Sequence, residues 1–111
     1  MSDDTNQNLA EIKKIYHLID DNFDPVYAKC KPDQKTHLVA LRDAARDVFW
    51  RAAAENLTDN HEVVAQTIDE LKTTNNKIQK DVKFLKDVSV FLDTVTQGVK
   101  LAAALATLAA A

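Results

Sequence analysis

The segment that decides the fold class runs from Asp59 to Ala111 and reads DNHEVVAQTIDELKTTNNKIQKDVKFLKDVSVFLDTVTQGVKLAAALATLAAA. It contains no proline and a single glycine, Gly98. Mostly apolar or small residues recur in it at alternating steps of four and three, the spacing that places side chains on one face of a helix. An unbroken pattern of this kind favours one long, coiled-coil-like helix. The seam consists of Val64, Ile68, Leu71, Asn75, Ile78, Val82, Leu85, Ser89, Leu92, Thr96, Val99 and Ala103.

A second interpretation divides this segment at residues 73–76, Thr-Thr-Asn-Asn, which are four weak helix formers in a row. A turn there would give a four-helix bundle. The phase of the seam does not slip across these residues, however, and a single asparagine at a core position is a known device for fixing helix register. We therefore expect a continuous helix in which Asn75 is helical and either pairs across the seam or reaches water, because a buried unpaired amide costs about 1–3 kcal/mol.

The first half of the chain predicts two shorter helices. Apolar side chains recur at helical spacing from Leu9 to Phe23, and Asp24-Pro25 ends this helix because the residue before a proline is pushed out of the α region. A second helix is expected from Asp33 to about residue 56, with an apolar seam that ends near Ala52. The sequence thus predicts an all-α antiparallel bundle of two shorter helices and one long C-terminal helix. Residues 1–8 are expected to form a flexible tail, and residues 9–111 a single helical domain.

Composition supports a folded helical protein and bounds its function. Hydrophobic residues make up 46% of the 111 residues and charged residues 28%, whereas one glycine and two prolines supply too few turns for an all-β fold. The single cysteine, Cys30, and the polar N-terminus predict a cytoplasmic protein without an internal disulfide. The net charge of −3, with no strongly basic face, predicts no nucleic-acid partner.

No pattern of residues predicts catalysis, a cofactor or a metal. The two serines, Ser2 and Ser89, lie on no nucleophile elbow, and one glycine cannot build a phosphate-binding loop. His61 begins a zinc-protease-like helix, but Ala65 stands where the second histidine is needed. Cys30 lies near lysines that could lower the pKa of its thiol, although an ordinary loop cysteine is the favoured interpretation. We therefore expect a protein that is not an enzyme.

The apolar C-terminal end predicts association with another molecule. A helix from residue 59 to residue 111 would be about 75–80 Å long, so the two shorter helices could cover only part of it. Leaving its large apolar side chains in water would forfeit several kcal/mol. Small residues at steps of four would also let another helix approach closely. The predicted interface consists of Phe84, Val88, Phe91, Val95, Gly98, Ala102, Ala106 and Ala110.

A second candidate contact patch consists of Trp50, Arg46 and Arg42, because Trp50 lies off the predicted seam and tryptophan and arginine are enriched at interface centres. The expected function is a non-enzymatic, adaptor-like interaction module that pairs with itself or with a helical partner protein.

The alternative is a peripheral membrane protein, of the kind found in pore-forming and cell-death domains, whose apolar helix inserts reversibly into an anionic membrane. Its candidate headgroup contacts are Lys77, Lys80, Lys83 and Lys86.

Overall fold

The structure, a computed structural model, describes residues 7–54, 62–83 and 87–109, and helices are the only regular secondary structure in these residues. The predicted all-α class is therefore confirmed. Gln7 and Asn8, which were assigned to the flexible tail, are the first residues of the first helix. The helices are α1 (Gln7–Asp21), α2 (Phe23–Lys29), α3 (Pro32–Ala54), α4 (Glu62–Lys83) and α5 (Val88–Ala109).

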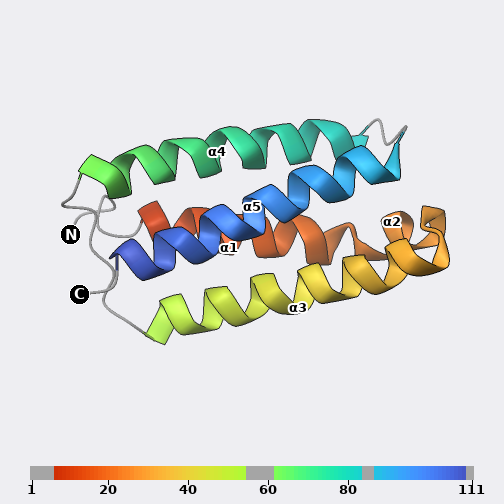
Figure 1. Ribbon diagram of the computed structural model, residues 1–111, viewed down its shortest axis with the longest axis horizontal. Coiled ribbons are helices and arrows are strands. Elements are labelled where there is room, and N and C mark those ends of the chain that lie inside the picture. The colour runs from red at the N-terminus through yellow and green to blue at the C-terminus, as the bar shows by residue number, and fades with distance from the viewer. Residues whose placement is uncertain (1–6, 55–61, 84–86, 110–111) are drawn as a thin grey trace.

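The four longer helices form an antiparallel bundle of two helical hairpins, with outer dimensions of 42 × 22 × 21 Å (Figure 1). Helix α1 runs antiparallel to α3, and α4 runs antiparallel to α5. The hairpins lie side by side so that α1 also contacts α4, and α3 also contacts α5. The short helix α2 lies at the end of the bundle where the chain passes from α1 to α3 (Figure 1).

The prediction of one long C-terminal helix is wrong, because α4 ends at Lys83 and α5 begins at Val88 and runs back along α4 (Figure 1). Asp87 caps the returning helix: its Oδ1 accepts a hydrogen bond from the backbone N–H of Ser89 at 2.9 Å and another from Val90 at 3.4 Å. An aspartate side chain at this position satisfies backbone donors that the helix itself leaves unpaired. The reversal therefore has a local sequence signal, the cap Asp87.

The alternative turn at residues 73–76 is also wrong, because these residues lie inside α4. The hydroxyl groups of Thr73 and Thr74 donate to the carbonyl oxygens of Asp69 and Glu70, one helical turn earlier, at 3.0 and 2.9 Å. These bonds satisfy the threonine hydroxyls within the helix, so weak helix propensity does not break it. The four-helix arrangement of the alternative is present, but with its last reversal between α4 and α5.

The core runs through all the helices, and the face that α5 gives to it differs from the predicted seam. Ser89 and Ala103 of the seam are exposed, whereas Phe91, Val95 and Leu105 are buried. Leu92 and Val99 of the seam are buried as predicted, so the buried face of α5 only partly departs from the seam, because α5 packs against α4, α3 and α1 as a separate helix.

The connection between the first two predicted helices contains helix α2. Its Val26 is buried against the core, and Pro25 lies in its first turn, where the missing N–H has no helical partner to lose. Helix α3 then starts at Pro32, the first helical position that proline favours. The backbone N–H of Lys31 donates to Gln34 Oε1 at 2.8 Å and completes the cap.

Candidate association surfaces

The predicted interface on the C-terminal helix lies inside the bundle. Phe91 is 1% exposed, and Val95, Gly98 and Ala102 are buried as well. Val88 and Ala106 are half-buried against the same core, while Phe84 and Ala110 lie outside the described residues. For the described residues of this interface, the premise that they lack a partner within the chain is wrong, because the reversal after α4 lets the other helices of the same chain pack against them.

Gly98 allows close helix packing, as the spacing of small residues predicted, but the helices that approach it belong to the same chain. A Cβ atom at this position would collide with Cδ1 of Ile15 on α1. It would also lie 3.3 Å from Thr74 Cγ2 and 3.4 Å from Ile78 Cδ1, both on α4. Gly98 therefore sets how closely α5 approaches α1 and α4.

We predict that Gly98→Val lowers the free energy of unfolding by about 1–3 kcal/mol, the usual cost of overpacking a core. Urea unfolding followed by circular dichroism measures this loss. Ala104→Val on the exposed side of α5 is the control, and it should cost only the lower helix propensity of valine, about 0.5 kcal/mol. Adding Ile15→Val to the Gly98 variant removes the colliding Cδ1 and should recover part of the lost unfolding free energy. Equal losses of stability from the substitutions at positions 98 and 104 would contradict the close approach of the helices.

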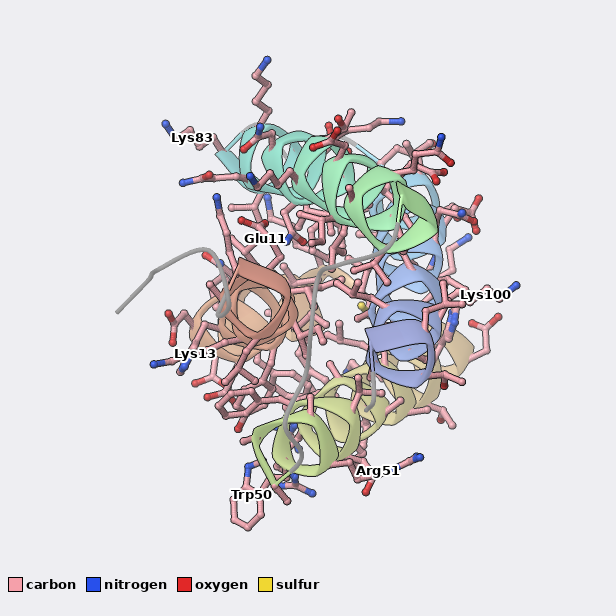
Figure 2. The ribbon with its side chains drawn as sticks, turned by 90° about the vertical axis from the view of Figure 1, so that its left-hand side faces the viewer. Glu11, Lys13, Trp50, Arg51, Lys83 and Lys100 are labelled. Atoms are coloured by element: carbon pink, nitrogen blue, oxygen red, sulfur yellow. The ribbon has the colours of Figure 1, made fainter. Side chains whose placement is uncertain are left out.

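The outer side of α5 carries two separated exposed hydrophobic residues, Val90 (49% exposed) and Leu108 (45% exposed). The exposed polar side chains of Asp93, Gln97 and Lys100 lie between them in the sequence, and Figure 2 shows Lys100 pointing away from the bundle. By length and composition alone, residues Val88–Leu108, with a mean hydropathy of 1.3, could cross a membrane. A core helix of a bundle has the same apolar composition, because its buried side is apolar. The high hydropathy of α5 therefore does not by itself define an association surface.

Trp50 is the large hydrophobic side chain that α3 leaves most exposed, at 67% (Figure 2). The residues that α3 buries, from Leu38 to Ala52, form a stripe on its other side, so the helical period turns Trp50 outward. A hollow of about 430 Å³ lies on one side of the indole and another of about 380 Å³ on the other. We define the Trp50 surface as Asp43, Arg46, Asp47, Trp50, Ala53 and Ala54.

Arg46 and Asp47, which line the hollow beside the indole, each form a loose ion pair. Arg46 Nη2 lies 3.4 Å from Asp43 Oδ1, and Arg51 Nη1 lies 3.8 Å from Asp47 Oδ2. Because these pairs are exposed, each is worth about 0–1 kcal/mol and can regroup around a partner at little cost.

Of the predicted patch, the structure brings together Trp50 and Arg46 but not Arg42, which is half-buried. The guanidinium carbon of Arg42 lies 4.1 Å from the ring centre of Phe23, in a cation–π contact that attaches α2 to α3. The acidic residues Asp43 and Asp47 were not predicted as part of the patch. Asp43 lies seven residues before Trp50 and Asp47 three residues before it, and this helical spacing was the signal that could have identified them.

Three of the candidate headgroup lysines, Lys77, Lys80 and Lys83, are exposed on α4, and Lys86 lies outside the described residues. Lys80 and Lys83 belong to the last turn of α4, where positive charge is favourable beside the negative end of the helix dipole. A contribution to helix stability therefore explains the positions of Lys80 and Lys83 without a membrane.

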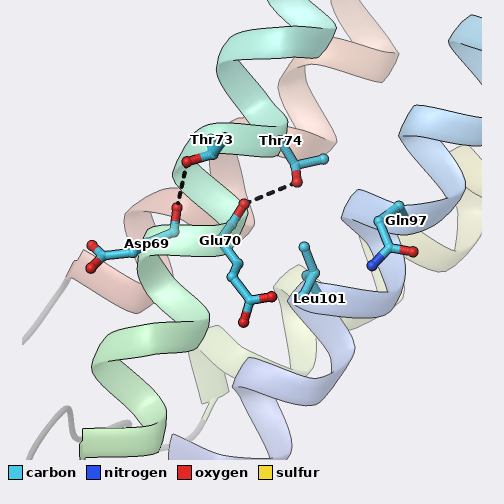
Figure 3. Close-up of a pocket in the computed structure, with 6 residues that line it drawn as sticks. All are labelled: Asp69, Glu70, Thr73, Thr74, Gln97 and Leu101. Atoms are coloured by element: carbon cyan, nitrogen blue, oxygen red, sulfur yellow. Dashed lines mark hydrogen bonds between the residues drawn. The ribbon is translucent and has the colours of Figure 1, made fainter.

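A shallow groove of about 360 Å³ lies on the surface between the packed helices α4 and α5 (Figure 3). Its lining residues include Asp69, Glu70 and the apolar Leu101, and Figure 3 shows the carboxylate of Asp69 pointing away from α5. The hydroxyl groups of Thr73 and Thr74 at this groove already donate within α4, as the dashed lines in Figure 3 show. Within the described residues, no three histidine, cysteine, aspartate or glutamate side chains lie close enough together to hold a metal ion.

Cys30 is buried between α2 and α3, and its Sγ donates to the carbonyl oxygen of Val26 at 3.3 Å. Burial raises the pKa of this thiol, and the nearby positive charge of Lys35 opposes the rise. A raised pKa reduces the thiolate fraction at neutral pH, so the environment of Cys30 is opposite to that of an activated cysteine.

We predict that Cys30 in the folded protein reacts with iodoacetamide at pH 8 at least about tenfold more slowly than in urea, because the thiol is buried and its pKa is raised. The folded pKa lies above the unfolded one, so the contribution of this thiol to stability is present at neutral pH and is lost as pH rises above about 9. Mass spectrometry of the alkylated protein measures the rates. Equal rates in the folded and unfolded states would contradict the burial.

Asn75 is the one fully buried large polar side chain in the described core, with 0% exposure. Its Nδ2 donates to both the backbone oxygen and Oε1 of Glu11 on α1, each at 3.1 Å, while its Oδ1 has no partner within the described residues. The prediction that Asn75 is helical and pairs across the seam is confirmed.

Comparison of the chain with protein-family models, with curated proteins and with solved structures found no significant match.

Proposed function

We propose that this chain is a non-enzymatic helical interaction module that binds another protein through the Trp50 surface of α3. The exposure of Trp50 carries the proposal. Aromatic residues near arginine are enriched at the centres of protein interfaces, where they supply a large share of the binding energy. Trp50 is two-thirds exposed, so covering it buries more apolar surface, and releases more free energy, than covering any other exposed large hydrophobic side chain of the described chain.

The rest of the molecule supports this choice of surface. The apolar face of α5 is covered by the other helices, so the central residues of the interface predicted from the sequence, Phe91, Val95 and Ala102, are not accessible. Helix α3, by contrast, has a full buried stripe on one side and the Trp50 surface on the other. A rigid helix that is held by the bundle loses little conformational entropy when it docks, which favours binding. In this proposal the protein acts in the cytoplasm.

A photo-cross-linking amino acid placed in the chain inside the source cells tests the proposal. At Ala54, beside the indole, it should capture a defined protein, and Trp50→Ala in the same chain should abolish the capture. At Ala104, exposed on α5, it should capture nothing. Capture from position 104 but not from position 54 would assign the function to α5 and overturn the choice of surface.

A second candidate function is reversible membrane binding, which is favoured by the length and apolar composition of α5. Insertion would require the bundle to open, because α5 keeps large side chains such as Phe91 and Leu105 in the core. Flotation with vesicles of mixed phosphatidylcholine and phosphatidylglycerol tests this function. Binding that is lost in a Lys77→Glu, Lys80→Glu, Lys83→Glu variant would support it, and an absence of binding at low salt would exclude it.

A further inference from the structure

We infer that the partner of the Trp50 surface is a second copy of this chain, docked antiparallel along α3 about a twofold axis level with residues 46 and 47. This inference rests on the proposed function, since it names the occupant of the same surface. Figure 2 shows the indole of Trp50 projecting from the outer side of α3. The hollow beside it is lined by Asp43, Arg46, Asp47 and Trp50 itself.

The projection and the hollow are adjacent on one helix, which is the requirement for a self-complementary interface. In a twofold dimer each subunit presents the same patch to the other, so residue i faces residue j and residue j faces residue i. With the axis between residues 46 and 47 of two antiparallel helices, position 50 of one copy faces position 43 of the other. The indole of each copy then enters the hollow of its partner, whose volume of about 430 Å³ is in the range of sites that hold ring-sized groups.

The charges on α3 are complementary in the same register. Arg46 of one copy faces Asp47 of the other, and the twofold axis repeats this contact, so two opposite-charge pairs form at the centre. Arg46 already lies 3.4 Å from Asp43 in the isolated chain, which places its guanidinium group next to the hollow. The incoming indole can therefore cover this guanidinium group in a cation–π contact.

The interface along one helix is small, so we expect a reversible dimer rather than a permanent one. Stable interfaces bury about 800 Å² on each partner, and α3 is only about 35 Å long at 1.5 Å per residue. Charge complementarity between subunits chiefly sets register and specificity. Changing the charges should therefore alter pairing in a predictable way.

Charge reversal with mixing tests the register. Arg46→Asp leaves acidic residues at both 46 and 47, and Asp47→Arg leaves basic residues at both. Each variant should repel its own copies and dimerise at least about tenfold more weakly than the wild type in sedimentation equilibrium at low salt. An equimolar mixture of the two variants should regain dimers, because every contact then joins opposite charges. A mixture that associates no better than the separate variants overturns the inference.

Trp50 provides a label-free readout, because it is the only tryptophan of the chain. In the wild type its emission maximum should move to shorter wavelength as protein concentration and average mass rise, since dimerisation excludes water from the indole. Val90→Ala removes an exposed hydrophobic side chain elsewhere and should change neither measurement. A mass increase without a shift of the Trp50 emission would place the contact on another surface and overturn the inference.

Failure of the dimer and failure of the proposed function are distinguishable. A wild-type chain that stays monomeric at high concentration overturns the inference alone if the cross-linker at Ala54 captures a different protein. If the chain is monomeric and position 54 captures nothing, the proposed function falls as well. Capture of a second copy at Ala54, together with recovery of dimers in the mixture, supports both.

Discussion

Replacing Phe91 by alanine is expected to lower the free energy of unfolding by about 3–5 kcal/mol, the cost of removing a buried aromatic side chain and leaving a cavity. Phe91 is among the largest fully buried side chains of the described chain and lies where α5 faces the other helices. Since small domains are stable by only about 5–15 kcal/mol, this loss would bring the bundle close to unfolding at room temperature. Urea unfolding monitored by helical circular dichroism measures it.

The adjacent residue gives a matched control. Val90 precedes Phe91 on the same turn of α5 but is half exposed, so Val90→Ala should change the unfolding free energy by no more than about 0.5 kcal/mol. If the C-terminal helix were instead an exposed association surface, Phe91→Ala would weaken assembly and leave the stability of the monomer unchanged. Equal, small effects of the two substitutions would therefore contradict the buried position of α5.

Replacing Asn75 by aspartate is expected to cost about 3–5 kcal/mol at pH 7, because it leaves a buried carboxylate without a partner. The side-chain amide that donates to Glu11 is lost, and the new carboxylate faces acceptor oxygens of Glu11 that lie 3.1 Å from the present donor. Burial and the like charge of Glu11 should raise the pKa of the new carboxyl group above its unfolded value. The protonated form is then favoured in the folded state, so the penalty is small at low pH and appears as pH rises.

The measurement for this variant is the difference in unfolding free energy from the wild type at pH 4 and at pH 7. The difference should be clearly larger at pH 7. Asn76→Asp is the control, because Asn76 is exposed on the same helix and its substitution should change stability by no more than about 0.5 kcal/mol at either pH. A pH-independent effect at Asn75, or equal effects at the two positions, would show that Asn75 is not buried against α1.

The helical class and most of the core follow from the sequence, because both depend on local spacing. The seam residues of α3 and α4, such as Leu38, Ala45 and Ile68, are buried as their period of three and four requires. Asn75 was correctly placed in a helix core because its position keeps this period. Its partner Glu11 is 64 residues away in the chain, and no local pattern relates the two.

The reversal between α4 and α5 could not be inferred from periodicity, because the spacing of the sequence continues in phase between Lys83 and Val88, where neither glycine nor proline occurs. The cap Asp87 is the local signal, and it is weak because an aspartate in a charged stretch is equally at home on a helix surface. Because of this single error, residues that lie inside the bundle, such as Phe91 and Val95, were predicted to form an interface on the outside of a long helix. The exposure of Trp50 could be predicted despite this error, because it depends only on the period of α3.

The central claim is that the apolar C-terminal helix folds back into the bundle, which leaves the Trp50 surface for association. The fold-back is tested most directly by a spin-label distance between α4 and α5. The labels are attached to cysteines that replace Gln66 and Ala104 in a Cys30→Ala background. Both positions are exposed, so the labels report the distance between the helices without disturbing the core contacts of either helix. Neighbouring helices pack with axes about 8–10 Å apart, so the fold predicts a label distance of roughly 10–30 Å. A distance near 57 Å, the length of about 38 residues of continuous helix at 1.5 Å each, would contradict it.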